Sequence, residues 1–346
     1  MSAERPSLAV AVAAGLATVA AVAVAILAAG ASPGAVLAGI IDRAILSPSG
    51  FAEAVVRAIP LTLLGLAVAV AFRARLYNIG ADGQLLVGAA VGVACAAILP
   101  ANPLGLVGLL LLGALGGALW GGLAGILKAR FGANEIIVTI MLNYVAVQLI
   151  SYLVRGPLQE SMGIFPRSDA IASALELGVI IEGTRIHGGL IIAVLAALVL
   201  AFVLSRTQFG FRLNVFGQNP NAARYAGHAT GRQIIWVMAL SGGLAGLAGI
   251  IEVSALYGRL QEGFAQGFGI AAIAVALVAR LNPLAVPFSA LLFAALYVGL
   301  GGVAREGSVP FPLINIIEAA VVFVFLIVLA VTNVQQRRRQ MARAAQ

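Results

Sequence analysis

The chain has 346 residues, of which 62% are hydrophobic and 10% are charged, and its formal net charge is +8. Soluble domains carry about 25% charged residues, so this composition predicts a protein that crosses a membrane several times. The single cysteine, Cys95, excludes an internal disulfide and any site built from several cysteines. The two histidines, His187 and His228, are far apart in sequence, which argues against a paired-histidine metal site.

Apolar stretches long enough to cross a membrane follow one another along the chain. A spanning helix needs roughly 20 mostly apolar residues. The stretches that meet this need are 8–30, 55–72, 84–100, 104–127, 135–153, 188–205, 233–256, 264–280, 285–303 and 312–332. We therefore expect an all-α membrane bundle of about ten helices, forming one domain over residues 1–346. The first stretch exceeds the roughly 7–15 apolar residues of a secretory signal, so we expect it to be a retained span.

The distribution of charge predicts the orientation. With the N-terminus inside, the inside segments hold fourteen of the 21 basic residues and three of the 13 acids. The outside segments hold the other seven basic residues and eight acids. By the positive-inside rule, both termini, including the basic tail 333–346, are expected in the cytoplasm of a multi-pass cell-membrane protein. The long outside segment 154–187 is then a surface on which a partner could dock.

A polar run, "LYNIGADGQLLVG" (76–88), interrupts the apolar sequence between the second and third spans. It contains Asn78, Asp82 and Gln84, interspersed with glycines. Unwound, glycine-rich backbone is how transporters expose polar groups to a cargo. Amides and a carboxylate can bond the hydroxyls of a neutral polyol such as ribose. We predict that these three side chains line the substrate path.

A second interpretation of this run stays open, namely a polar turn that joins two helices. In that case Arg73 or Arg75 would pair with Asp82. The fifth span favours the path, because Thr139 and Asn143 lie four residues apart and therefore share one helix face. Asn143 is the one expected to face the path.

Other residues are expected to be structural. Asn134 can cap the fifth span, and Glu135 suits the positive end of that helix. Glycines recur every fourth residue in two spans and let neighbouring backbones approach closely. These packing glycines are Gly113, Gly117, Gly121 and Gly125 in the fourth span, and Gly242 and Gly246 in the seventh.

The cytoplasmic segment 206–232 carries four arginines and no acid. Asn219 followed by Pro220 predicts a helix start, and Gly227 predicts its end, so we expect a helix over 220–226. A helix this short is unstable alone and must be held by docking. The small residues expected to be exposed for this purpose are Ala222, Ala223 and Ala226. The alternative is a basic loop that lies on anionic lipid.

The segment "GQNPNAARYAG" (217–227) resembles the coupling loop of permease subunits of ABC importers, although Asn221 replaces the usual acid before the two alanines. "YNIGADGQ", "GANEIIVTIMLNY" (132–144) and "GFGIAAIAVALVARLNPL" (267–284) resemble the branched-chain amino acid and simple-sugar permease superfamily, in its nucleoside and simple-sugar branch. The resemblance implies that a partner ATPase contacts this loop. The coupling residues would be Gly217, Asn219, Pro220, Ala222, Ala223, Tyr225 and Gly227.

This resemblance also implies the other components of the transporter. They are cytoplasmic ATPase subunits, a second permease subunit that is a paralogue, and an extracytoplasmic binding protein that delivers a nucleoside or simple sugar. The chain has no phosphate-binding loop, since its one lysine, Lys128, lies in "GILKAR". ATP would therefore be used by the partner, with no cofactor bound by this chain and no nucleic acid as a partner.

One alternative function comes from a different class. Glu252 and Glu318 lie within predicted spans, and intramembrane carboxylates can carry protons in an ion-coupled secondary transporter. An enzyme is not expected, because the sequence shows neither a nucleophile with a base nor a metal-ligand cluster.

Overall fold

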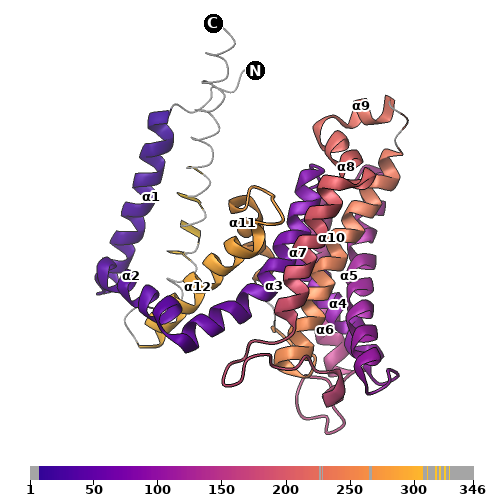
Figure 1. Ribbon diagram of the computed structural model, residues 1–346, viewed down its shortest axis with the longest axis horizontal. Coiled ribbons are helices and arrows are strands. Elements are labelled where there is room, and N and C mark those ends of the chain that lie inside the picture. The colour runs from indigo at the N-terminus through magenta and orange to yellow at the C-terminus, as the bar shows by residue number, and fades with distance from the viewer. Residues whose placement is uncertain are drawn as a thin grey trace, which may run out of the picture. The chain divides into compact units, whose positions relative to one another are not determined.

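The computed structural model describes residues 8–225, 227, 229–264 and 267–306, together with residues 310, 316, 317, 319, 320, 323, 324 and 327. The described chain is helical, with two isolated β-bridges and no named strand (Figure 1). It forms two compact units. Unit 1 comprises residues 1–54 and 292–346, and unit 2 comprises residues 55–291.

Unit 1 is built from α1 (Leu8–Ala28), α2 (Pro33–Ile41), a π-helical turn (Asp42–Leu46), the start of α3 (Pro48–Arg73) and the end of α12 (Val286–Arg305). A break separates α1 from α2, and the two helices are bent by 96°. Gly30 adopts a left-handed φ of 82°, and the Ser32 hydroxyl accepts a hydrogen bond from the Ala35 amide at 3.1 Å. Ser32 followed by Pro33 is a preferred start for a helix, so the chain turns here and begins again.

Unit 2 contains the remaining helices. They are α4 (Ala81–Ala96), α5 (Pro103–Phe131), α6 (Glu135–Arg155), a 3₁₀ turn (Ser173–Leu175), α7 (Gly189–Arg206), α8 (Gln208–Gln218), α9 (Pro220–Tyr225), α10 (Thr230–Glu252), a π-helical turn (Val253–Tyr257) and α11 (Phe268–Val278). The most extensive packing joins α5 to α10, and α4 packs on both.

The hairpin between α5 and α6 shows how the sequence sets a helix boundary. Gly132 ends α5 in the left-handed region, at a φ of 66°. The Asn134 side chain then accepts hydrogen bonds from the amides of Ile136 and Ile137, so the cap expected at Asn134 is present. Lys128 pairs with Glu135 across the turn. Glu135 therefore contributes to the structure of this hairpin.

The described residues contain six helices long and apolar enough to cross a membrane, or seven if α1 and α2 form one bent span. Two expected spans differ from the helices found. Residues 84–100 correspond to α4, which begins three residues and ends four residues earlier, and 264–280 correspond to α11, which has only 11 residues. Apolar composition continues beyond both helices, but the backbone does not: Arg280 and Leu281 are left-handed at φ 53° and 56°. Most of the expected span 312–332 lies outside the described residues.

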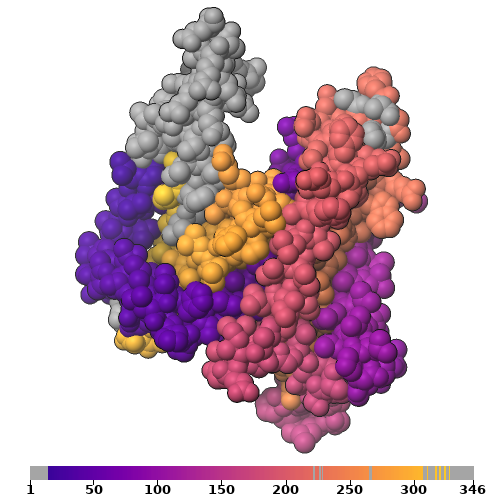
Figure 2. Space-filling view, in the orientation of Figure 1, coloured from indigo at the N-terminus to yellow at the C-terminus, as the bar shows by residue number. Residues whose placement is uncertain are grey.

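The two polar segments of unit 2 lie at opposite ends of its bundle. Figure 1 shows α8 and α9 at one end and the connection between α6 and α7 at the other. In Figure 2, α9 projects from its end of the unit.

Candidate functional site

The connection between α3 and α4 is the polar centre of unit 2. Residues 76–80 have no regular secondary structure, and Asn78 within them is fully buried. Asn78 and Gln84 form a reciprocal amide pair, with Nδ2 to Oε1 at 2.9 Å and Nε2 to Oδ1 at 3.0 Å. Asn78 Nδ2 also donates to Ser241 Oγ at 2.8 Å, and Ser241 donates to the Ala67 carbonyl at 2.7 Å. This network links α3, α4 and α10.

Helix α6 holds the same connection from another side. Asn143 Nδ2 donates to the Ile79 carbonyl at 2.9 Å, and Asn143 Oδ1 accepts from the Gly83 amide at 2.8 Å. The Ile79 amide donates to Thr139 Oγ1 at 3.3 Å. The two polar residues of α6 thus satisfy backbone groups that the break between α3 and α4 leaves without helical partners. Such groups cannot stay unpaired away from water.

The structure brings together three of the residues predicted to line the path, namely Asn78, Gln84 and Asn143. Asn78 is 0% and Gln84 is 1% exposed, and their amides bond to each other. In this state the network joins helices. Contact with a cargo stays a prediction that requires these partners to separate. Ser241, which completes the network, was missed by sequence reasoning; a hydroxyl within an apolar span was the available signal.

Asp82 lies beside this network and holds a different helix. Its Oδ1 accepts a hydrogen bond from the Gly269 amide at 2.6 Å, in the first turn of α11. The pairing with Arg73 or Arg75 that the turn interpretation offered is not formed among the described residues, and Arg73 Nε instead donates to the Leu281 carbonyl at 2.9 Å. The free amides at a helix start carry partial positive charge, which stabilises a carboxylate placed there.

Helix α11 is consequently clamped at both ends. Asp82 holds its first turn, and Arg73 holds the chain just after its last turn. A side chain at Gly269 would meet Asp82 at 2.7 Å, so glycine permits the close approach. With 11 residues, α11 is about 16 Å long and cannot cross a bilayer core of about 30 Å alone. Short helices of this kind form binding sites in transporters.

Two substitutions of Asp82 separate its possible roles. Asp82→Asn keeps an oxygen that can accept the Gly269 hydrogen bond, whereas Asp82→Ala removes it. We expect the asparagine variant to retain most uptake and the alanine variant to lose roughly tenfold or more. A hydrogen bond to a charged group contributes about 1.5–3 kcal/mol, and about 1.4 kcal/mol is tenfold. Uptake into proteoliposomes measures both. Equal losses in the two variants would show that the charge, not the clamp on α11, is required.

The segment from α8 to α9 rests on the end of α3. A side chain at Gly217 would meet the Arg73 carbonyl oxygen at 2.1 Å, so the backbones of α8 and α3 are in direct contact. Leu213 and Phe216 on the same helix are buried. Helix α8 was not predicted, since sequence reasoning placed only a loop before Asn219. Gln208–Gln218 carries a Thr207 cap that was the missed signal.

Helix α9 begins at Pro220, as predicted, and ends at Tyr225. Gly227 follows with a left-handed φ of 81°, and the Asn219 carbonyl accepts from the Ala223 amide. One expectation was wrong: Ala223 is fully buried, because it packs inside the loop. Tyr225 is 93% exposed instead. The side chain of Ala222, and Ala226 altogether, lie outside the described residues.

Glycines bring α4, α5 and α10 into backbone contact. A side chain at Gly117 would meet the Gly242 carbonyl oxygen at 2.2 Å, and one at Gly246 would meet the Gly113 carbonyl oxygen at 2.4 Å. A side chain at Gly88 of α4 would meet the Gly246 Cα at 2.3 Å. Gly121 and Gly125 continue the α5 face against Met238 and Ile235. The polar network therefore sits beside a rigid three-helix junction.

The connection between α6 and α7 is ordered against residues 258–262. The Leu260 amide donates to Ser168 Oγ at 2.9 Å, and the Ser168 amide donates to the Leu260 carbonyl at 2.8 Å. The hydrogen bond from Arg167 holds the pKa of Glu160 below its usual range. This ion pair is therefore present at neutral pH and is lost only when the pH falls below that lowered pKa. Met162, at the turn, is 79% exposed.

The structure describes one of the two residues of the alternative ion-coupled function. Glu252 is 2% exposed at the end of α10, before the π-helical turn, and Glu318 lies outside the described residues. In the part of the chain that the structure describes, no three His, Cys, Asp or Glu side chains gather as metal ligands.

A bundle of apolar helices, a buried polar break between helices and a short clamped helix define a membrane permease. A family model described as "Branched-chain amino acid transport system / permease component" matches residues 50–332. The glucose ABC transporter permease protein of Haloferax volcanii is 39% identical over 82% of this chain and 77% of its own length. The guanosine ABC transporter permease protein of Bacillus subtilis is 39% identical, over 76% of this chain and 77% of its own.

A nucleoside ABC transporter permease protein of Lactococcus lactis is 32% identical over 76% of this chain and 75% of its own length. The chain belongs to this family of permease components, and it is a transport subunit, not an enzyme, of the cell membrane. No solved structure matches it significantly. The ion-coupled alternative is not favoured.

Proposed function

We propose that this chain forms the translocation path for a nucleoside or simple sugar in an ABC importer. The names of the relatives support this cargo class, since they specify glucose, guanosine and nucleosides. The polar groups around the α3–α4 break support it too, because they are neutral amides and hydroxyls that match a neutral polyhydroxylated molecule. The test is uptake of labelled guanosine, other nucleosides and glucose by the assembled transporter. If the transporter takes up none of these compounds, the cargo assignment is overturned.

The observation that carries the coupling part of the proposal is the geometry of α8 and α9. Leu213, Phe216 and Ala223 of these helices are buried, whereas Phe211 and Tyr225 are 66% and 93% exposed. We assign this end to the cytoplasm and to a partner ATPase. The opposite segment, 154–187, then faces an extracytoplasmic binding protein. In this arrangement about ten crossings place both termini, including 333–346, inside. A second permease subunit, a paralogue, completes the path.

Transmission can follow backbone contacts within unit 2. A partner that moves α9 also moves α8, and Gly217 of α8 touches the Arg73 carbonyl. The Arg73 side chain holds the chain beyond α11, and the break after Arg73 leads to Asp82, which holds the start of α11. When ATP binding closes the ATPase subunits, α11 would thus shift relative to the hydrogen-bonded network of Asn78, Gln84 and Ser241. The amides of this network would then separate and become available to cargo.

Replacing Tyr225 by alanine tests the coupling surface. Exposed aromatic residues that become buried in an interface often contribute roughly 2 kcal/mol or more to binding. We expect Tyr225→Ala to reduce co-purification of the ATPase subunit and to reduce uptake in proportion. Ala223→Glu is a poorer test, since a charge at this buried position would disrupt the loop itself.

The control is Tyr144→Ala, which removes a tyrosine that is 67% exposed in the middle of α6. It should leave the complex intact. If the Tyr225→Ala variant co-purified with as much ATPase subunit as wild type does, the coupling surface would lie elsewhere. This result would leave the proposed cargo class unaffected.

A further inference from the structure

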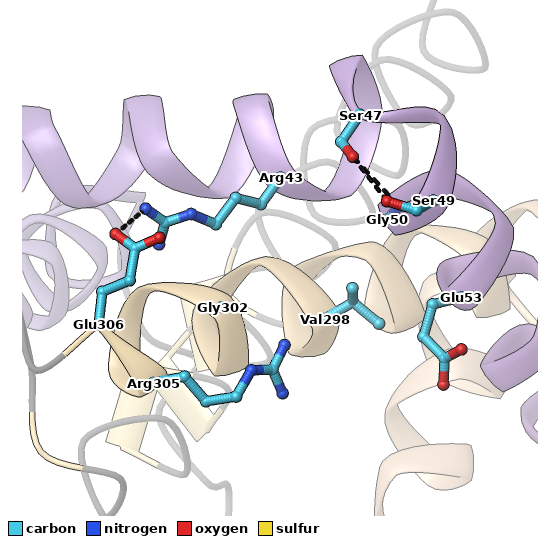
Figure 3. A pocket seen from close by; sticks show the side chains of 9 residues that line it. All are labelled: Arg43, Ser47, Ser49, Gly50, Glu53, Val298, Gly302, Arg305 and Glu306. Atoms are coloured by element: carbon cyan, nitrogen blue, oxygen red, sulfur yellow. Dashed lines mark hydrogen bonds and ion pairs between the residues drawn. The ribbon is translucent and has the colours of Figure 1, made fainter.

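Unit 1 contains a cavity of about 400 Å³ between the turn that joins α2 to α3 and the last turns of α12 (Figure 3). Its polar lining consists of Arg43, Ser47, Ser49, Glu53, Arg305 and Glu306. Two guanidinium groups and two carboxylates therefore face one space, so the cavity has no net charge but strongly separated charges. A zwitterionic ligand suits such a lining better than a simple anion or a neutral sugar does.

The donors of this cavity are not all used by the protein. Arg43 Nη2 pairs with Glu306, but Arg43 Nη1 is buried and has no hydrogen-bond partner. Among the described residues, no hydrogen bond or ion pair is recorded for Arg305, and Figure 3 shows its side chain lying along α12. Ser47 Oγ and Ser49 Oγ are 3.1 Å apart. A buried guanidinium donor without a partner costs free energy, which a bound oxygen acceptor would recover.

The position of the cavity along α12 points to the bilayer interface. Helix α12 has 20 residues, ends at Arg305 and is apolar enough to span a membrane. Its length of about 30 Å equals the thickness of the hydrocarbon core. If α12 crosses the membrane, Arg305 lies at the level of the lipid headgroups, where phosphodiester groups are concentrated.

The neighbouring helix α2 has the form of an interfacial helix. It bends by 96° from α1, so it runs along the membrane surface if α1 crosses the membrane. Leu37, Ile41 and Ile45 are spaced four residues apart and are 59%, 42% and 55% exposed. The opposite face packs on α12, where a side chain at Gly39 would meet Val303 at 2.9 Å. The exposed stripe fits acyl chains.

We propose that this cavity binds the headgroup of an aminophospholipid. The phosphodiester would accept hydrogen bonds from Arg43 and Arg305, the amine would face Glu53, and the acyl chains would lie on the stripe Leu37, Ile41 and Ile45. This site is separate from the path in unit 2, and it does not depend on which cargo the protein carries.

The test uses the full-length chain purified with its co-expressed subunits and stripped of lipid by detergent. Phosphatidylethanolamine, phosphatidylglycerol and diacylglycerol with the same acyl chains are added, and retained lipid is counted by native mass spectrometry. We expect phosphatidylethanolamine to be retained in preference to both others. Arg305→Gln should weaken its retention roughly tenfold or more, as expected for one hydrogen bond to a charged group.

Arg206→Gln is the matched control, since Arg206 likewise ends an apolar helix and is exposed. It should retain the lipid as wild type does. Equal retention of the three lipids, or equal loss with the two variants, would overturn the proposal. Displacement of the lipid by millimolar inorganic phosphate would also overturn it, because the cavity would then be a site for a soluble anion. A monodisperse elution profile for Arg305→Gln shows that the loss is not unfolding.

Discussion

Replacing Gly217 by alanine should uncouple ATP hydrolysis from transport. The added Cβ would lie 2.1 Å from the Arg73 carbonyl oxygen, and 3.3 Å from the Cα of Ala74. Backbone cannot rotate away as a flexible side chain does, so α8 must shift from α3. Overpacking of this kind costs about 1–3 kcal/mol. If the free energy that couples the movement of α9 to that of α11 falls by this amount, uptake should fall about five- to 150-fold. ATP hydrolysis by the complex should continue.

The control for this variant is Gly231→Ala. Gly231 lies in the first turn of α10, and its added Cβ would be 3.8 Å from Ala129, an ordinary contact. Uptake and ATP hydrolysis by this control should match those of wild type. If Gly217→Ala retained full uptake, the contact between α8 and α3 would not transmit the motion. If the complex lost its ATPase subunit, the variant would have damaged the docking surface instead.

Replacing Gly246 by alanine should destabilise the core of unit 2. The added Cβ would lie 2.4 Å from the Gly113 carbonyl oxygen and 2.8 Å from the Cα of Gly117. Both atoms belong to the α5 backbone, so the two helices must separate. We expect a loss of about 1–3 kcal/mol, seen as a lower midpoint of thermal unfolding in detergent and a lower yield of monodisperse protein.

Gly243→Ala provides the matched control on the same helix. Its Cβ would lie 3.4 Å from the Ala114 carbonyl oxygen and 3.5 Å from Ala118 Cβ, which are ordinary contacts. Alanine is favoured over glycine within a helix by about 1 kcal/mol. The midpoint of this variant should therefore be unchanged or raised. Equal midpoints for the two variants would show that the close approach at Gly246 is not needed for stability.

Local chemistry explains which features could be predicted from sequence. The low content of charged residues predicts a protein in lipid. Long apolar stretches there form helices, because a helix pairs all its backbone N–H and C=O groups within one segment. The cap at Asn134 and the start of α9 at Pro220 depend only on the residues beside them. The motif at 76–88 was recognisable as a break because it combines glycines with amides in an apolar chain.

Sequence reasoning failed where a partner is distant along the chain. One interpretation offered the nearby Arg73 or Arg75 as the partner of Asp82, but its carboxylate accepts from the amide of Gly269, 187 residues away. Ala223 was expected to face outward, but the packing of the loop buries it. The ends of α4 and α11 were placed too far along the chain, because hydrophobic residues continue past the point at which the backbone leaves the helix.

The sequence by itself thus determined that this protein is a helical membrane permease, and where its polar break and the short helix α9 lie. These properties follow from composition, local caps and short motifs. Only the tertiary structure decided that Asn78 and Gln84 bond to each other, that Asp82 and Arg73 clamp α11, and that Ala223 of α9 is buried while Tyr225 is exposed. Hydrogen bonds and burial between distant residues depend on which helices pack together, and the local sequence does not determine that packing.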